Sequence, residues 1–180
     1  MTKFEKAKNR IAEIISHSEE KTDSRHSLNT LEWLLKLQPN ADEILQLAAL
    51  AHDIERASSD RLRLRMFKTY DEYKSAHALR GAEIAKQLVK DIGYSDEEAG
   101  RIFEMIKYHE VGNGNPEVDV IRDADSISYF DVGIEEYLRR AGEDVTRNKI
   151  KFMRERASEN VKIIIDEIIR NKPELSKLFF

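Results

Sequence analysis

The amino-acid sequence predicts an all-α protein with a single domain, residues 1–180. Apolar residues recur at helical intervals of three and four along most of the chain, and no alternating strand pattern runs long enough to compete. Only 7 Gly and 3 Pro interrupt the chain, and 41% of its residues are hydrophobic. At this length folding buries roughly 70% of the unfolded surface, so we expect one large core.

Three helices are expected in the N-terminal part. The first covers about residues 3–18, where apolar side chains share one face. The second begins at Asp23 or Ser24, either of which can cap a helix, and stops near Pro39. The third covers about residues 41–56 and has the most apolar sequence of the three.

Four further helices are expected after a basic linker. A long one, residues 71–92, should end at Gly93, a residue suited to a left-handed C-cap. The next opens at Ser95, which has capping-box spacing with Glu98, and runs to about residue 109. After a glycine-rich break, the last two are expected over about residues 118–140 and 145–171.

Composition excludes several classes of site and partner. The chain has no cysteine, which rules out disulfides, thiolate nucleophiles and iron–sulfur clusters, so any metal must have nitrogen and oxygen ligands. The start lacks an apolar signal segment and no stretch approaches the ~18 apolar residues of a membrane span, so we expect a cytoplasmic protein without a membrane partner. The net charge of −4 argues against nucleic acid as the main partner. Oligomeric state stays open, a homo-oligomer included.

The stretch "LAALAHDIERA", residues 47–57, places two chemically active residues at the end of an apolar helix. Helical spacing turns His52 inward with Leu45. Asp53 follows about 100° further around the helix, so both side chains can converge on one ion. A buried carboxylate without a partner is costly, and a metal ion is one of the few partners that offset this cost.

Three more histidines and one aspartate occupy core-facing stripes: His26, His77, His109 and Asp125. For any single histidine, a hydrogen-bonded structural residue is the ordinary interpretation. Four of the five histidines nevertheless share this placement, and only His17, within "SHSEEK", has the surroundings of a solvated side chain. The joint pattern therefore favours a metal site.

In chain order these residues resemble the H...HD...D signature of the HD-domain superfamily of metal-dependent phosphohydrolases. The resemblance covers about residues 25–130 and is carried by "RHSLNTLEWL", "LAALAHDIERA" and "DADSISYF". It implies a helical bundle with a central metal site. One ion would be held by His26, His52, Asp53 and Asp125.

The segment "DAD" offers two aspartates for the last position of this signature. The superfamily's aspartate usually follows an alanine and begins an inward helical face, which favours Asp125. Asp123 would then lie behind the ligands or on the surface.

His77 and His109 exceed the minimal signature. They resemble the additional ligands of two-metal members, including the HD-GYP phosphodiesterases and the di-iron oxygenases related to inositol oxygenase, in which case Asp53 would bridge the ions. The segment "YHEVGNGNP" is similar to the HD-GYP stretch "HHE...GSGYP" but lacks the double histidine and the Gly-Tyr-Pro end. This departure argues against cyclic dinucleotide specificity.

The expected cofactor is one or two divalent ions, because nitrogen and carboxylate ligands suit Mn, Fe, Co, Ni or Zn. Two ions about 3.5 to 4 Å apart can activate a water near neutral pH and clamp a phosphoryl oxygen. The resemblance thus implies hydrolysis of a nucleotide, phosphomonoester or phosphodiester, with Asp53 and Arg56 as catalytic residues. A di-iron oxygenase with nearly the same ligands is the alternative. A purely structural metal is disfavoured because a domain of this size buries enough core without one.

Cationic side chains near the ions would help to bind a small anionic substrate. Arg56 stands where many HD hydrolases have the lysine of "HDxGK", and it begins a basic segment that extends to Lys74. Arg25, Lys74 and Lys107 are the other candidates for substrate binding. The competing interpretation of Arg56 is a surface arginine paired with Glu55 or Asp60.

Overall fold

A computed structural model describes residues 1–179 and confirms the all-α prediction: these residues form helices and no β-strand. The first elements are α1 (Lys3–Ser16), α2 (Asp23–Leu37), α3 (Glu43–Ala51), the short 3₁₀ helices η1 (Ile54–Ala57) and η2 (Leu64–Met66), α4 (Tyr70–Ile92) and α5 (Asp96–Tyr108). They are followed by α6 (Pro116–Ser128), the π turn η3 (Tyr129–Gly133), α7 (Ile134–Ala141), α8 (Glu143–Glu155), α9 (Glu159–Arg170) and α10 (Pro173–Phe179). Within residues 1–179 no helix combines the length and apolar character that a membrane crossing requires.

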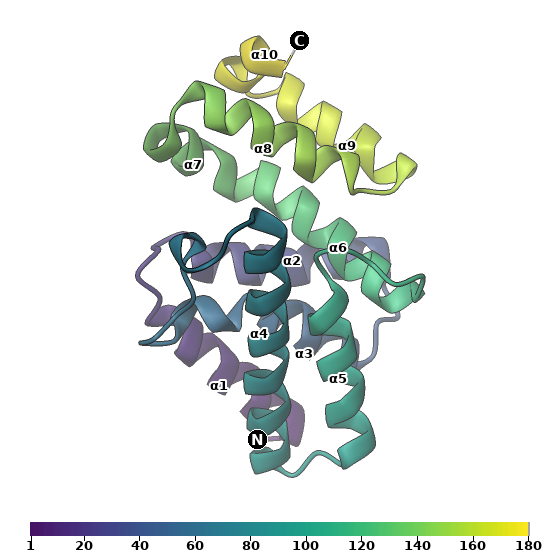
Figure 1. Cartoon of the computed structure of the whole chain (residues 1–180). Helices are drawn as coiled ribbons and strands as arrows, with labels where there is room; N and C mark the ends of the chain where they lie inside the picture. Colours follow the sequence, from purple (N-terminus) through teal and green to yellow (C-terminus); the bar gives the residue numbers. More distant parts are fainter. Residues whose placement is uncertain (180) are drawn as a thin grey trace.

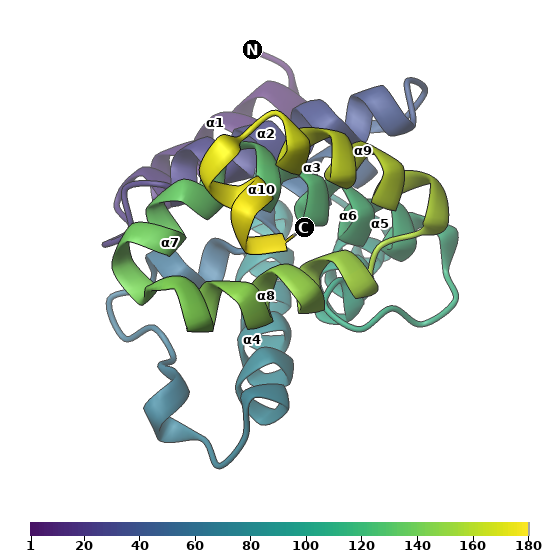
Figure 2. The same cartoon turned by 90° about the horizontal axis from the view of Figure 1, so that it is seen from above.

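The helices form two layers joined by α6 (Figure 1). The larger apolar core lies among α1 to α5 and the first half of α6, and a second core lies among the π turn and α7 to α10. Trp33 and Leu37 of α2 pack against both cores. Seen from above, α8 passes over α4 (Figure 2), and Lys149 of α8 reaches the hydroxyl of Tyr70 at the start of α4.

Local capping explains several helix ends. The predicted capping box is present at α5, where the Ser95 side chain accepts from the Glu98 amide and Glu98 accepts from the Ser95 amide. The long α4 begins with an equivalent box at Thr69 and ends at Gly93, whose φ of 102° confirms the predicted left-handed C-cap.

The third predicted helix is wrong at its C-terminal end. α3 stops at Ala51, His52 occupies its C-cap, and the chain tightens into η1 at residue 54. Within η1, the Glu55 carboxylate accepts from the Leu62 amide, 2.6 Å away, and this contact binds the turn to the following loop. Because the helix has ended, His52 and Asp53 lie on a bend that opens toward the centre of the molecule.

The two predicted C-terminal helices are also interrupted. The π turn, in which five residues close one wide turn, separates α6 from α7. The second break lies before Ser158, whose extended backbone presents its amide to Asp123 Oδ1 at 2.8 Å. The spacing of apolar residues along the chain does not reveal either break. The sequence pattern also did not predict α10.

Candidate metal centre

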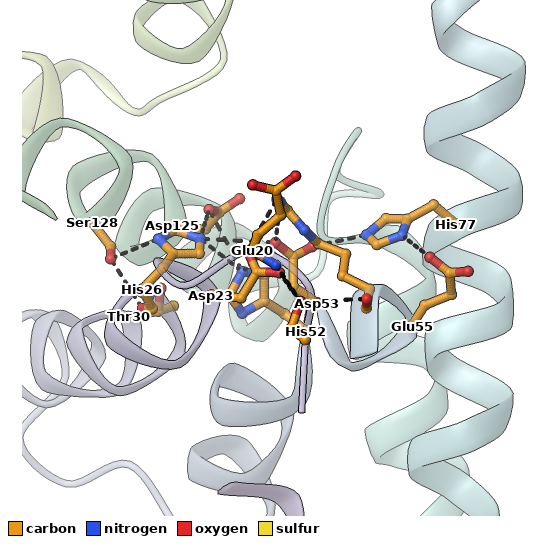
Figure 3. A network of polar contacts seen from close by, with 12 residues as sticks. Glu20, Asp23, His26, Thr30, His52, Asp53, Glu55, His77, Asp125 and Ser128 are labelled. Carbon is orange, nitrogen blue, oxygen red and sulfur yellow. Dashed lines mark hydrogen bonds and ion pairs between the residues drawn. The ribbon is translucent and has the colours of Figure 1, made fainter. Parts of the chain in front are cut away.

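Four imidazole rings point into the interface between the two layers, and each is buried or nearly so. Figure 3 shows three of them, those of His26, His52 and His77. An oxygen acceptor occupies the Nδ1 side of every ring. The acceptors are Ser128 Oγ for His26 at 2.9 Å, the Ala49 carbonyl for His52 at 2.8 Å, Glu55 Oε2 for His77 at 2.7 Å, and the Ile106 carbonyl for His109 at 2.6 Å. Since Nδ1–H donates to these oxygens, each ring directs Nε2 inward, as the histidine ligands of metals do.

The inward nitrogens of His26, His52 and His109 have unusual surroundings. His26 Nε2 and His52 Nε2 lie 3.2 Å apart, a contact that requires a shared proton or a cation between them. His109 Nε2 is buried and has no hydrogen-bond partner within residues 1–179, although its ring centre lies 5.3 Å from that of His52. A buried nitrogen without a partner is rare in proteins and suits a metal ligand.

Two aspartates lie against these nitrogens. Asp125 Oδ1 lies 3.0 Å from His26 Nε2 and 3.6 Å from His52 Nε2. Asp53 lies between the two sides of the cluster, with Oδ1 2.8 Å from His77 Nε2 and Oδ2 3.7 Å from His52 Nε2. Asp53 therefore contacts histidines on both sides of the cluster.

Six side chains fall into two groups, and within each group the ligand atoms lie within 4.8 Å of one another. One group is His26, His52 and Asp125, and the other is Asp53, His109 and Glu110. His77 belongs to neither group but contacts Asp53. Both groups offer the nitrogen and carboxylate oxygen ligands that first-row divalent metals accept. The described residues could therefore hold a metal ion, and two adjacent groups leave room for a second.

Burial and charge set the protonation of the metal-free cluster. Burial opposes charge on His52, but Asp53 and Asp125 outweigh it and raise the pKa of His52 to about 9. Burial lowers the pKa of His109 to about 4, so this ring is neutral at physiological pH. Both aspartates resist protonation despite burial, because neighbouring histidines and arginines hold their pKa values well below the usual range.

Cations bind the outer oxygens of the carboxylates. Arg156, which directly follows α8, contacts Asp125 and also donates from Nη1 to Glu110 Oε2 at 2.7 Å. Lys74 of α4 forms an ion pair with Glu110. These contacts hold the carboxylates in place and connect the candidate ligands to the C-terminal layer.

A family model described as "Domain of unknown function (DUF4202)" matches residues 3–178. The chain belongs to this family. No curated protein and no solved structure is significantly similar to it. The DUF4202 match spans both helical layers and includes every candidate ligand.

A cavity of about 440 Å³ opens over the cluster of this DUF4202 chain, lined by residues of both layers. Arg56 and Lys74 line it, together with His26, Asp53 and His77. Arg56 donates to Asp53 Oδ2 at 3.2 Å and lies 3.0 Å from Asp23 Oδ1, so its partners differ from those of an ordinary surface arginine.

Two residues predicted to bind substrate lie elsewhere in the DUF4202 fold. Arg25 is exposed and lines a separate hollow on the outside of α2, because it precedes His26 by one residue and therefore points about 100° away. The ammonium of Lys107 lies over the ring of Tyr108, 4.6 Å from its centre. Neither Arg25 nor Lys107 lines the cavity. His17 is exposed, in agreement with its solvated surroundings in the sequence.

The structure also separates the two aspartates of "DAD". Asp125 joins the histidine cluster, whereas Asp123 holds the amide of Ser158 at the start of α9. Glu55, which replaces the small residue of "HDxGK", is buried and orients His77. Because the Glu55 carboxylate is buried and bound to His77 and to the Leu62 amide, it is not a surface partner of Arg56.

Sequence reasoning did not assign roles to Glu110, Arg156 or Lys149. Glu110 directly follows His109 in "YHE", so its position beside a predicted ligand was a usable signal. Arg156 and Lys149 lie beyond the region of the HD resemblance, and only the tertiary packing of α8 brings them to the cavity.

Proposed function

We propose that this protein is a metal-dependent phosphohydrolase of the HD-domain type that acts on a small phosphorylated substrate. The main support is the convergence of four Nε2 atoms and three carboxylates beside one cavity that also carries several cations. A purely structural metal would need no such cavity. The same cluster accounts for the buried, unpartnered nitrogen of His109.

The candidate ligands are His26, His52, Asp125, Asp53, and on the other side His77, His109 and Glu110. When bound, divalent ions supply Lewis acidity and an activated water for attack on a phosphate ester. The chain contributes rigid ligand orientation, since every Nδ1 is already held by an oxygen. Glu55 keeps the Nε2 of His77 directed at Asp53.

Substrate binding is assigned to the cavity wall. Arg56 is fixed by Asp53 and Asp23, while about a third of its side chain remains exposed toward the cavity. A guanidinium held in this way presents several N–H groups to phosphoryl oxygens without further ordering. Lys74 lies deeper and is bound to Glu110.

The cations of the cavity wall also favour this proposal over the oxygenase alternative. Arg61, Arg63 and Arg140 line the cavity beside Arg56 and Lys74, and each of the three is paired with a carboxylate. A neutral polyol would make little use of so many cations, whereas an anionic substrate is attracted by them.

The test is an activity panel with metal-loaded protein. We expect Mn- or Co-loaded protein to release phosphate or a nucleoside from phosphomonoesters, nucleotides or phosphodiesters under anaerobic conditions, and the His52→Ala variant to be inactive. Turnover that depends on Fe(II) and consumes dioxygen, without hydrolysis of any ester, would replace the hydrolase with the oxygenase. Equal metal content in wild type and His52→Ala would refute the metal centre itself.

A further inference from the structure

The cavity contains a second polar region where it meets the C-terminal layer. Lys149 extends from α8 and donates to the Tyr70 hydroxyl at 3.0 Å. Its ammonium lies 5.7 Å from the centre of the Tyr129 ring and 5.2 Å from that of Phe152. Among residues 1–179, no carboxylate forms an ion pair with Lys149. A mostly buried ammonium thus has only a phenol and aromatic faces for partners.

The charged groups around Lys149 do not neutralise it. Lys74 and Arg156 add positive charge to its surroundings. The nearby carboxylates of Glu110 and Asp125 are bound by these two cations. Burial and the neighbouring cations lower the pKa of Lys149 to about 7. An additional anion at this place would therefore stabilise the charged form.

Tyr129 supplies an independent observation on the same wall. Its hydroxyl is buried and has no hydrogen-bond partner within residues 1–179. Its ring packs edge-on against Tyr137, with centres 5.9 Å apart, and both line the cavity together with Tyr70 and Lys149. A buried hydroxyl normally finds a partner, so its isolation indicates an acceptor that a ligand would provide.

We propose that Lys149, Tyr70 and Tyr129 form an oxyanion-binding subsite that holds a phosphoryl or carboxylate group of the ligand. Such a group accepts from the ammonium and from the free phenol, which satisfies both. The subsite belongs to α8, the π turn and the start of α4, so a ligand bound here would contact both layers. The assignment of this anion to a substrate rests on the proposed function, but binding requires no hydrolysis.

The first test is calorimetric titration with inorganic phosphate, and separately with acetate, at pH 6.5, where Lys149 is mostly protonated. Lys149→Met should weaken binding of the preferred oxyanion by about tenfold or more, because a charged hydrogen bond is lost. Lys151→Met is the matched control on the same helix, since the Lys151 side chain is 74% exposed and its partner is Glu155. It should leave the affinity unchanged.

A second variant separates binding from folding. Tyr129→Phe removes only the unpartnered hydroxyl, so thermal stability should stay the same or rise while oxyanion affinity falls by about threefold to tenfold. Tyr94→Phe is the control, because the Tyr94 hydroxyl is likewise buried without a partner but does not line the cavity. If Lys149→Met fails to fold, Tyr129→Phe decides the outcome.

The phosphate and acetate titrations together show which kind of oxyanion the subsite prefers. Metal content is measured for each variant. If Lys149→Met or Tyr129→Phe binds the oxyanion as tightly as wild type, at unchanged metal content, the subsite is refuted. The anion would then bind only at the metal. An equal loss in Lys151→Met or Tyr94→Phe would also overturn the subsite. If the protein hydrolyses none of the esters, the proposed function is refuted. Oxyanion binding that depends on Lys149 would still support the subsite.

Discussion

Metal binding should release protons at neutral pH, because His52 carries a proton in the metal-free protein. Its pKa of about 9 follows from Asp53 and Asp125, which favour the imidazolium despite complete burial. A metal ligand must present an unprotonated nitrogen, so the metal has to displace this proton. Each displaced proton changes the apparent affinity by about tenfold per pH unit below that pKa.

From pH 6 to pH 8, the apparent dissociation constant should therefore fall by at least about 100-fold, and the raised pKa of His77 adds to this. Calorimetry in two buffers of different ionisation enthalpy measures the number of protons released, which we expect to be at least about one at pH 7. His17→Ala should behave as wild type, since His17 is exposed. A constant affinity between pH 6 and 8, with no protons released, would refute the assignment of His52.

The proton on His52 opposes metal binding but stabilises the folded, metal-free protein. His52 has a raised pKa in the folded protein, so its contribution to the stability of the metal-free form is complete below about pH 6.5 and is lost as pH rises through about 9. The shift corresponds to about 3 kcal/mol of unfolding free energy. Denaturant unfolding of metal-free protein at several pH values checks this, and a stability that rises over that interval would contradict it.

Three further predictions concern stability and are measured by thermal or denaturant unfolding. Phe130→Ala should cost about 3 to 5 kcal/mol, because Phe130 is fully buried in the second core and leaves a cavity; a loss below about 1 kcal/mol would contradict that packing. Arg156→Met should cost about 3 kcal/mol because it removes the cation that two buried carboxylates share. Arg154→Met, which breaks a more exposed pair with Asp166, should cost less than about 1 kcal/mol. Ser95→Ala should cost about 1 kcal/mol through loss of the capping box, and an unchanged midpoint would show that the cap contributes nothing.

The predicted ligands came from residues whose helical phase is fixed by nearby apolar neighbours. His77 and His109 share faces with buried side chains of their own helices, and this relation is readable from three- and four-residue spacing. Arg156 escaped prediction because its contact with Glu110 spans 46 residues of chain. Charged residues have no periodic signature when their partners lie on another layer.

Some helix boundaries are likewise set by nearby residues and others by contacts with a different helix. Gly93 and Ser95 mark their helix ends by local backbone chemistry, so both were predicted and are confirmed. The break before Ser158 depends on the Asp123 carboxylate from a different helix. No window of neighbouring residues contains that information.

The π turn at residues 129–133 constrains the chain length between the two layers. It adds residues to a path that would otherwise continue α6 straight into α7, and its Asp131 side chain accepts from Trp33 Nε1 at 2.9 Å. If the same residues were instead wound as a regular α-helix, α7 would be rotated by about 100° relative to Asp125 on α6. Tyr137, one of the tyrosines of the cavity wall, would then leave the cavity while every candidate metal ligand stayed in place. Relatives that share the ligands and the length of this segment but form a regular helix here should therefore differ in the molecules that they bind.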